Sequence, residues 1–416
     1  MIRIISAKNI PLQKTIDTNS RKNIISIIND IQKRGDVAVR KYEKKFSNVN
    51  TKSFKITSRE IKSAYENISS NQLRAVRHAK KTLENTERQT MRALNNIEIS
   101  NKGVRIKRSF KPISSVGCYV PGGLALYPSS LIMGVVPAKV AGVKRIIVST
   151  PTDKTGRINP LVLVAADICK VDEIYKVGGA QAIAAMSIGT KSIPKVDKII
   201  GPGGKYVSMA KIESSSITSI DMYAGPTELG IIADSTSDPK LVAVNLISQA
   251  EHSKDTCCFL LTTSEKLAKK VQSIIKNIKT LRSDIVQASL KNNGFIICCK
   301  NDKEMINLAN ELAPEHLEIL TKSPDRFVKL IVTPGLVLVG RDTPSSASDY
   351  LLGSNHILPT NQFGKTRGSL SVLDFLKLHT VVKSTRPVLK NIYKDIKVLT
   401  TKEGLPNHLE AVRLRL

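Results

Sequence analysis

The sequence predicts an α/β fold built on largely parallel sheets, and the arrangement of apolar and helical segments supports this fold class. From about residue 112 onward, short apolar runs alternate with helical segments, the order typical of parallel strands joined by helices. The alternation comes in two series, the first ending near residue 212 and the second starting at residue 229, which indicates two sheets. Residues from about 18 to 105 instead carry helical periodicity, as in the isoleucine-rich segment Asn23–Arg34.

Each series pairs expected strands with expected helices. In the first series the expected strands are Ile113–Tyr119, Arg145–Ser149, Glu173–Val177 and Lys198–Ile200, and the helices are Leu131–Val140, Leu161–Ile168, Ala180–Ile188 and Lys205–Ile212. In the second series the strands are Leu229–Ala233, Thr256–Thr262, Phe295–Cys299 and Leu317–Leu320, and the helices are Pro239–His252, Glu265–Ile278 and Lys303–Leu312. A mixed tail from about residue 371 ends in a helical segment, Pro406–Leu414.

The net charge of +29 reflects 64 Lys and Arg residues against 35 Asp and Glu residues. Such a charge can indicate nucleic-acid binding. The lysines are spread along the whole chain, however, aromatic residues make up only 4%, and no nucleic-acid module is recognisable. A lysine-rich solvated surface is therefore the favoured interpretation, and its field would help to attract anionic ligands such as a dinucleotide. At 416 residues the chain is long enough for two or more domains.

The sequence predicts a cytoplasmic protein with no membrane contact. No apolar stretch approaches the ~20 residues that span a bilayer, and Met1–Ile5 lacks the apolar core and cleavage site of a signal peptide. None of the six cysteines has CxxC spacing. The adjacent cysteines Cys257–Cys258 and Cys298–Cys299 are poor metal or disulfide pairs, because neighbouring residues of a strand point to opposite faces. We expect small core residues in a reducing compartment at Cys118, Cys169, Cys257, Cys258, Cys298 and Cys299.

Four of the six histidines lie in short polar segments that also contain a carboxylate or an amide. That combination suits a metal site, acid–base chemistry, or both. In the first segment, Gln249 and His252 share one face of a helix whose start is marked by Asp238 and Pro239. From spacing alone a solvated stripe is slightly favoured, and because Gln is not a usual zinc ligand only His252 is nominated here.

The other three polar segments are ambiguous when taken singly. Glu315 and His316, beside a proline, are either an acid–base pair or the cap of a helix end, and the two readings are equally supported. The segment Asp349–His356 reads as a functional loop or as ordinary turn chemistry, with Asp349 a plausible hard metal ligand. Glu403–His408 is a weak signal, because a histidine near a terminus is usually exposed.

Three glycine-rich turns follow expected strands, at Tyr119–Gly123, Val177–Gln181 and Gly201–Gly204. Backbone amides at such turns can bind phosphate. None matches the GxGxxG fingerprint, and each alone is compatible with a tight connection between a strand and a helix. Three in one α/β series indicate a nucleotide crevice at the carboxyl ends of the strands.

In combination, these motifs resemble the histidinol dehydrogenase family over nearly the whole chain, and their order and approximate spacing also match. The matching segments are Tyr119–Gly123, Gly178–Ala182, Gly201–Gly204, Ala224–Glu228, Gln249–His252, Ala313–Glu318, Asn355–Thr360 and Glu403–His408. The resemblance implies a zinc- and NAD-dependent homodimer that performs the last steps of histidine biosynthesis. It would oxidise L-histidinol to L-histidine through L-histidinal, in two NAD-dependent steps.

The resemblance also implies roles for individual residues of this chain. The acid–base residues fall on Glu315 and His316. The ligands of one zinc per subunit fall on Gln249, His252, Asp349 and His408, the last supplied by the partner subunit. Substrate contacts fall on Thr227, Gln249, His252, His316, Asp349, His356, Glu403 and His408. The NAD contacts fall on Tyr119, Gln181 and the position of Gly204.

We predict two incomplete Rossmann-like parallel-sheet domains with small N- and C-terminal extensions. The N-terminal extension covers residues 1–17. Residues 18–118 together with 229–370 form the first domain, which carries the zinc and acid–base residues. Residues 119–228 form the second domain, with the NAD contacts, and the tail 371–416 contributes to the partner subunit's site.

The sequence departs from the family pattern at three of these positions. Gly204 stands where the family usually has Asn, which removes one polar NAD contact. Thr227 replaces a common Ser and keeps the hydroxyl. Ser348 replaces a usual Gly before Asp349, and we expect some backbone strain there if the glycine serves an unusual backbone angle. None of the three removes an expected zinc ligand or the acid–base pair.

Two other functions remain open at this point. One is a paralogous zinc- and NAD-dependent dehydrogenase of another polar alcohol, such as a sulfonated diol. Glu403, His356 and His316, which suit an imidazole-bearing amino alcohol, argue against it. The other is a basic nucleic-acid-binding protein on an inactive enzyme scaffold, which the charge motivates and the intact set of expected catalytic residues opposes.

Overall fold

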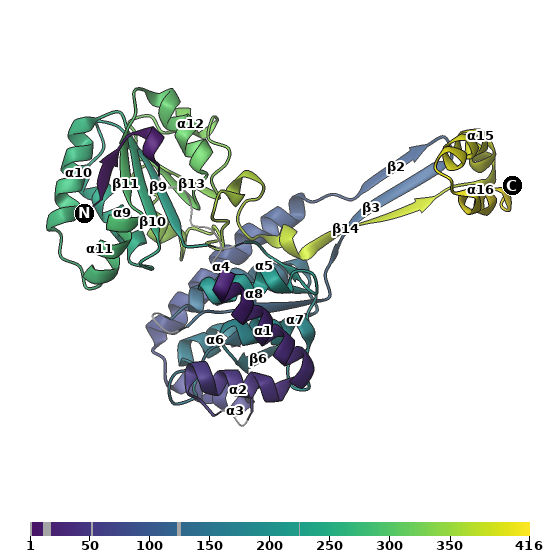
Figure 1. Ribbon diagram of the computed structural model, residues 1–416, viewed down its shortest axis with the longest axis horizontal. Helices are drawn as coiled ribbons and strands as arrows, with labels where there is room; N and C mark the ends of the chain where they lie inside the picture. Colours follow the sequence, from purple (N-terminus) through teal and green to yellow (C-terminus); the bar gives the residue numbers. More distant parts are fainter. Residues whose placement is uncertain (1, 11–17, 51–52, 123–125, 224) are drawn as a thin grey trace.

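Two parallel sheets with flanking helices form the body of the protein, and a three-stranded antiparallel sheet projects from it as an arm (Figure 1). The structure is a computed structural model that describes residues 2–10, 18–50, 53–122, 126–223 and 225–416. Gly123 and Ala224 of the expected motifs, and residues 1 and 11–17 of the N-terminal segment, lie outside the described residues. The prediction of an α/β fold with two parallel sheets is confirmed.

The larger sheet has six parallel strands in the order β1-β11-β10-β9-β12-β13. Its strands are β1 (Arg3–Ile5), β9 (Glu228–Ala233), β10 (Cys257–Thr262), β11 (Phe295–Cys298), β12 (His316–Ile319) and β13 (Leu336–Val339). One face packs against α9 (Pro239–Ala250), α10 (Glu265–Asn277) and α11 (Ser283–Asn292). The other face packs against α12 (Asp302–Leu312) and α13 (Asp325–Val328). Both faces are covered, which explains why most residues of these strands are apolar.

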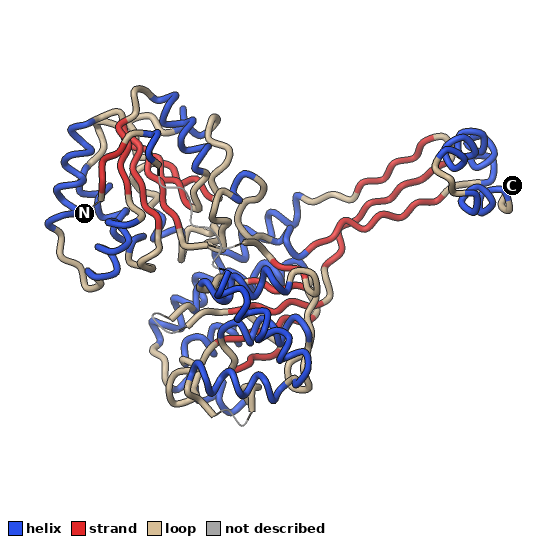
Figure 2. Tube along the Cα trace, viewed as in Figure 1, coloured by secondary structure: helices blue, strands red, loops and turns tan. Residues whose placement is uncertain are grey.

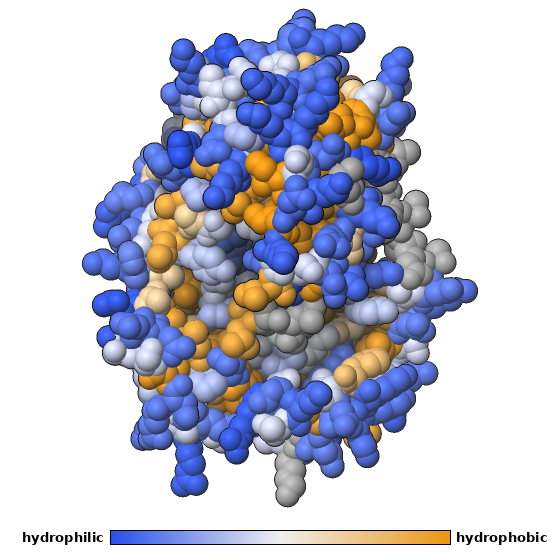
Figure 3. Space-filling model, turned by 90° about the vertical axis from the view of Figure 1, so that its left-hand side faces the viewer, coloured by the Kyte–Doolittle hydropathy of each residue, from blue (hydrophilic) through white to orange (hydrophobic). Residues whose placement is uncertain are grey.

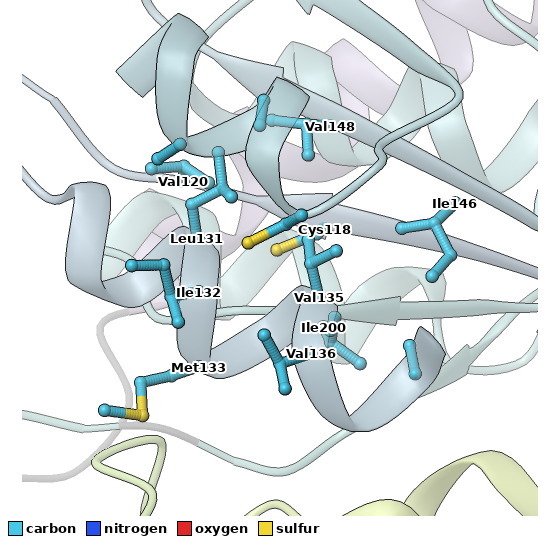
Figure 4. Packing of buried hydrophobic residues seen from close by; sticks show 14 of the residues in the cluster. Cys118, Val120, Leu131, Ile132, Met133, Val135, Val136, Ile146, Val148 and Ile200 are labelled. Carbon is cyan, nitrogen blue, oxygen red and sulfur yellow. The ribbon is translucent and has the colours of Figure 1, made fainter. Parts of the chain in front are cut away.

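The smaller sheet has five parallel strands in the order β6-β5-β4-β7-β8. They are β4 (Ser115–Tyr119), β5 (Arg145–Thr150), β6 (Glu173–Lys176), β7 (Lys198–Ile200) and β8 (Ser219–Ile220). Its helices are α5 (Pro128–Ala141) and α6 (Pro160–Ile168) on one face, and α7 (Gly179–Ile188) and α8 (Lys205–Ser214) on the other. Figure 4 shows Cys118 among Leu131, Val135 and Ile200 in the first of these cores.

Four helices precede the smaller sheet in the chain, and all four contact its helices. They are α1 (Thr18–Arg34), α2 (Asp36–Ser47), α3 (Ser58–Glu66) and α4 (Ser70–Ala93). α1 contacts α7 and α8, α3 contacts α6, and α4 contacts α5. These contacts favour grouping residues 18–93 with the smaller sheet, whereas the sequence grouped them with the larger one. Domain boundaries in this chain therefore stay a proposal.

The arm consists of β2 (Ile97–Asn101), β3 (Val104–Pro112) and β14 (Leu376–Lys383), and it ends in α15 (Arg386–Lys402) and α16 (Pro406–Arg413). Figure 2 shows the three strands leading away from the body to these two helices. The expectation of helix up to residue 105 is wrong from Ile97 onward. The segment forms strands because it pairs with β14, more than 260 residues later in the chain, in a register that sets Val382 beside Ile106.

The surface is largely hydrophilic, with apolar patches between the polar side chains (Figure 3). No helix in the described part of the chain is long and apolar enough to cross a membrane. All six cysteines are free thiols. The expectation that they are core residues is confirmed for Cys118, Cys169, Cys258 and Cys299, which are buried, while Cys257 and Cys298 are only partly covered.

Candidate active site

The polar residues of the larger sheet gather at the edge where its strands begin. Thr227 directly precedes β9, and Glu315 and His316 stand at the start of β12, beside β9 in parallel register. α9 follows β9 and returns antiparallel to it, which brings the helix's C-terminal end to this same edge. Gln249 Nε2, in the last turn of α9, donates to Thr227 Oγ1 at 2.8 Å. The structure thus brings together residues from three separate sequence motifs.

Glu315 is a buried carboxylate fixed by two donors. Its Oε2 accepts a short hydrogen bond from the Thr227 hydroxyl and a 2.9 Å bond from the backbone N–H of Glu228. Burial raises the pKa of Glu315 above its ordinary value, opposed by the neighbouring His316 and by the bond from Thr227. A carboxylate with a raised pKa and a fixed orientation is suited to accept a proton near neutral pH.

Glu228 lies in one of the matching motifs but was given no role there, and in the structure it holds the Glu315 loop in place. Its Oε2 accepts a 3.2 Å bond from the backbone N–H of Glu315, so each of the two residues binds the other's backbone. Its Oε1 accepts from the backbone N–H of Asn361 at 3.1 Å. Burial raises the pKa of Glu228 to about 8. Glu228 therefore joins three segments of the chain beside the expected general base.

His316, Asp349 and His356 form a second polar group at this edge. His316 Nε2 lies 3.4 Å from Asp349 Oδ1. Burial lowers the pKa of His316, but the carboxylates of Asp349 and Glu315 outweigh that effect and raise the pKa. Three buried atoms of this group have no hydrogen-bond partner among the described residues. They are the two ring nitrogens of His316 and Oδ1 of Asp349. These atoms are therefore available to a substrate or a metal.

His356 connects the two sheets. Its Nδ1 lies 2.7 Å from the backbone oxygen of Asp349, and because a carbonyl only accepts, Nδ1 carries the proton and donates. Its Nε2 lies 3.1 Å from the hydroxyl of Ser130 on α5, beside the smaller sheet. Burial lowers the pKa of His356, which favours this neutral tautomer, with Ser130 as the donor to Nε2. Ser130 is a further residue that sequence motifs did not identify.

Three of the four residues expected to bind zinc lie near one another within one chain. Gln249 and Asp349 lie at the same edge, and His252, directly after α9, is close enough to Asp349 for their charges to interact. A set of nitrogen and oxygen donors suits zinc, and the unsatisfied Asp349 Oδ1 is consistent with a ligand role. No group of three or more His, Cys, Asp or Glu side chains placed to hold a metal occurs among the described residues.

Ser348 does not strain the backbone. It lies in the short helix α14 (Ser345–Ser348), which ends at Asp349, and it is not among the described residues with a positive φ. Its hydroxyl lies 2.7 Å from that of Ser354. The expectation of strain at this position is therefore wrong, because the site presents an ordinary helical conformation that a serine adopts freely.

Glu403 and His408 lie away from this site. Glu403 caps the end of α15 and His408 is on α16, so both are at the tip of the arm (Figure 1). Both side chains are exposed. Of the residues expected to contact zinc or substrate, these are the two that the fold of a single chain does not bring to the site.

The smaller sheet presents the opposite edge, where its strands end. Tyr119 closes β4, and its hydroxyl accepts from the backbone N–H of Gly179 at 3.0 Å. Glu43 of α2 accepts from the backbone N–H of Gly178 at 3.0 Å and from Gln181 Nε2 at 2.7 Å. Tyr119 and Gln181 therefore shape the turn after β6 in addition to any ligand contact. Glu43, a buried helical residue distant in sequence, was not identified from motifs.

Glycine is required at one of these turns and tolerated at another. Gly201 has a φ of +110°, and a Cβ there would lie 2.1 Å from the backbone oxygen of Tyr119. Gly204 begins α8 at a φ of −65°, and a Cβ there would meet nothing within 4 Å. The structure therefore has room at position 204 for the asparagine that is usual in the family, so glycine is not needed there to avoid a clash.

The fold and the site together define a class: an α/β enzyme with a buried Glu–His pair suited to acid–base chemistry on one sheet and glycine-rich turns suited to a nucleotide on the other. The family model described as histidinol dehydrogenase matches residues 12–416. The curated histidinol dehydrogenases of Methanocaldococcus jannaschii and Methanococcus maripaludis are 41% and 42% identical to this chain over 395 residues. The alignments cover 94% of this chain and 92% of each relative.

A solved structure agrees with these relatives. The crystal structure of histidinol dehydrogenase from Elizabethkingia anophelis is 35% identical and has a TM-score of 0.90, covering 98% of this chain and 94% of the other. The chain belongs to the histidinol dehydrogenase family. It is therefore an oxidoreductase of an NAD-dependent family, and family membership implies histidinol as its substrate.

Proposed function

We propose that this protein oxidises L-histidinol to L-histidine through L-histidinal, in two NAD-dependent steps, as a zinc-containing homodimer with shared sites. The observation that carries the proposal is the convergence of Thr227, Gln249, Glu315, His316 and Asp349 at one edge of the larger sheet. These residues come from motifs far apart in the sequence, and together they provide a general base, an imidazole and metal-ligating groups.

The two acid–base residues suit two successive proton transfers. In the first step, His316 accepts the hydroxyl proton of histidinol while hydride passes to NAD⁺, which leaves the aldehyde. In the second step, Glu315 accepts a proton from the water that adds to the aldehyde, which gives the anion of the hydrate. Hydride transfer to a second NAD⁺ then gives the carboxylic acid, which releases its proton to solvent as the carboxylate forms. The Thr227 hydroxyl and the Glu228 N–H both donate to Glu315 Oε2, which fixes the orientation of this carboxylate.

Zinc, when bound, would hold the substrate's amino and imidazole nitrogens and so fix the carbinol carbon near the nicotinamide. The proposed ligands are Gln249, His252 and Asp349 of one chain and the partner subunit's His408. We assign substrate contacts to the same ligands and to Thr227, His316, His356 and Glu403, the last pairing with the cationic amine. The proposed NAD contacts are Tyr119, Gln181 and the position of Gly204.

A second copy of the chain is the proposed source of the missing residues. On one face of the arm, Ile99, Ile106 and Val382 align across the three strands. Ile99 and Val382 are 44% and 61% exposed. Exposed apolar rows of this kind mark interaction surfaces, and in a symmetric dimer each arm can reach the other body. The arm would then place Glu403 and His408 in the site of the partner subunit.

The direct test is NADH formation by the purified full-length protein supplied with L-histidinol, NAD and zinc. Two NADH per histidinol, activity lost on chelation and restored by zinc, and a dimer in solution are expected. Absence of turnover in the zinc-loaded protein would contradict the proposal. Turnover of a sulfonated diol in place of histidinol would favour the paralogous function.

A further inference from the structure

Glu318 is a buried carboxylate that the proposed chemistry does not use. It lies on β12 two residues after His316, so both side chains project from the same face of the sheet, the face that α9 covers. Glu318 is 0% exposed. Burying a carboxylate is costly unless hydrogen bonds compensate for the lost water, so its partners reveal its structural role.

The two oxygens of Glu318 bind two different helices. Oε2 accepts from Asn245 Nδ2 of α9 at 2.5 Å. Oε1 accepts from the backbone N–H of Ser345, the first residue of α14, at 2.8 Å. The first N–H groups of a helix have no partner inside that helix, and α14 has no side-chain cap on its N-cap residue. Glu318 supplies that acceptor from the sheet and ties α14 to α9.

Both contacts stand one helical turn from a proposed zinc ligand. Gln249 follows Asn245 by four residues on α9, and Asp349 follows Ser345 by four residues at the end of α14. Four residues advance an α-helix by about 6 Å and return to nearly the same face. A displacement of either helix relative to Glu318 would therefore displace a ligand as well.

We propose that Glu318 is a positioning residue for the metal site, whose two hydrogen bonds hold α9 and α14 at the spacing that lets Gln249 and Asp349 bind one zinc ion. The inference rests on the zinc site proposed above. Glu318 acts through the two helices and does not contact the metal. Removing residues that orient metal ligands typically weakens metal binding by about 10- to 100-fold.

The experiment measures zinc affinity of the full-length apo-protein by competition with a chelating dye, together with its thermal unfolding. Glu318→Ala is expected to weaken zinc binding by about 10- to 100-fold. Glu318→Gln is expected to restore most of the affinity, since its oxygen accepts from Ser345 and its amide can pair with a rotated Asn245. Asp234→Ala is the matched control, because Asp234 accepts the Lys322 N–H at 2.9 Å at the opposite edge of the same sheet.

A folded Glu318→Ala protein with wild-type zinc affinity would overturn the inference, and so would equal losses in Glu318→Ala and Asp234→Ala. If Glu318→Ala does not fold, Asn245→Ala replaces it, since it removes one contact and leaves the bond to Ser345. A smaller loss of affinity is then expected, and an unchanged affinity would overturn the proposal. Wild-type protein that binds no zinc would instead contradict the zinc site itself.

Discussion

The body and the arm of this protein contribute to the same proposed site in opposite ways. The body assembles its part inside one chain, where Thr227, Gln249, Glu315, His316 and Asp349 are joined by hydrogen bonds and close ion pairs. The arm carries its part, Glu403 and His408, to an exposed tip away from that edge (Figure 1). Under the proposed function, the acid–base residues come from one subunit, whereas Glu403 and His408 would complete the metal and substrate contacts from a second subunit.

The body itself combines two unlike edges. The larger sheet contributes the edge where its strands begin, and the smaller sheet contributes the edge where its strands end. Ligands of open α/β sheets usually bind at the carboxyl ends of strands, and the glycine-rich turns after β4, β6 and β7 follow that rule. The hydrogen bond between Ser130 of α5 and His356 links the two edges.

Breaking the arm's apolar face is expected to have the largest effect. Val382→Asp places a charge in the row formed with Ile99 and Ile106, which would exclude the partner and abolish turnover in the resulting monomer. Size-exclusion chromatography with light scattering, together with an activity assay, measures both results. Val381→Asp, on the opposite face of the same strand, is the matched control and should remain dimeric. A fully active Val382→Asp monomer would contradict the proposal that the arm of a second subunit is needed for turnover.

Removing the general base of the body should lower the rate while leaving the assembly intact. Glu315→Gln keeps the shape of the side chain but cannot accept a proton, so kcat is expected to fall by about 100-fold or more. Zinc content, dimerisation and KM for NAD should stay near wild type. A similar fall in zinc content would show that the carboxylate supports the metal site and not proton transfer.

A substitution at the tip of the arm should affect substrate binding more than turnover. Glu403→Gln removes the charge proposed to pair with the substrate's amine, and a lost charge-assisted contact is expected to raise KM for histidinol by about tenfold. Glu410→Gln, also on the arm but paired with Arg413, is the control. Equal KM values for Glu403→Gln and the wild type would contradict the proposed contact between Glu403 and the substrate's amine.

The smallest effect is expected on the nucleotide side of the body. Gly204→Asn restores the side chain usual in the family, at a position where the structure leaves open space. One added hydrogen bond to NAD is expected to lower its KM by about threefold, with kcat for histidinol unchanged. Steady-state kinetics with varied NAD measures this, and a raised KM would show that the asparagine does not fit here.

Sequence patterns predicted the two parallel sheets well, because buried strands and their helices carry local periodicity. They did not predict the arm, because Ile97–Pro112 is stabilised by pairing with β14 and its charged residues obscure the alternation. Motifs predicted roles for Glu315 and His316 but assigned none to the residues that hold them. Glu228 and Glu318 are carboxylates inside apolar strands, a signal that was present, whereas Glu43 and Ser130 come from helices distant in sequence and depend on the tertiary fold.

Mixing two inactive variants tests most directly whether two chains share each site. His252→Ala and His408→Ala subunits are each expected to be inactive as homodimers. A mixed dimer regains one intact site, with His252 from one chain and His408 from the other, so equimolar subunit exchange should restore about a quarter of wild-type activity. Mixed dimers confirmed by differential tags that show no activity would contradict a site shared between subunits.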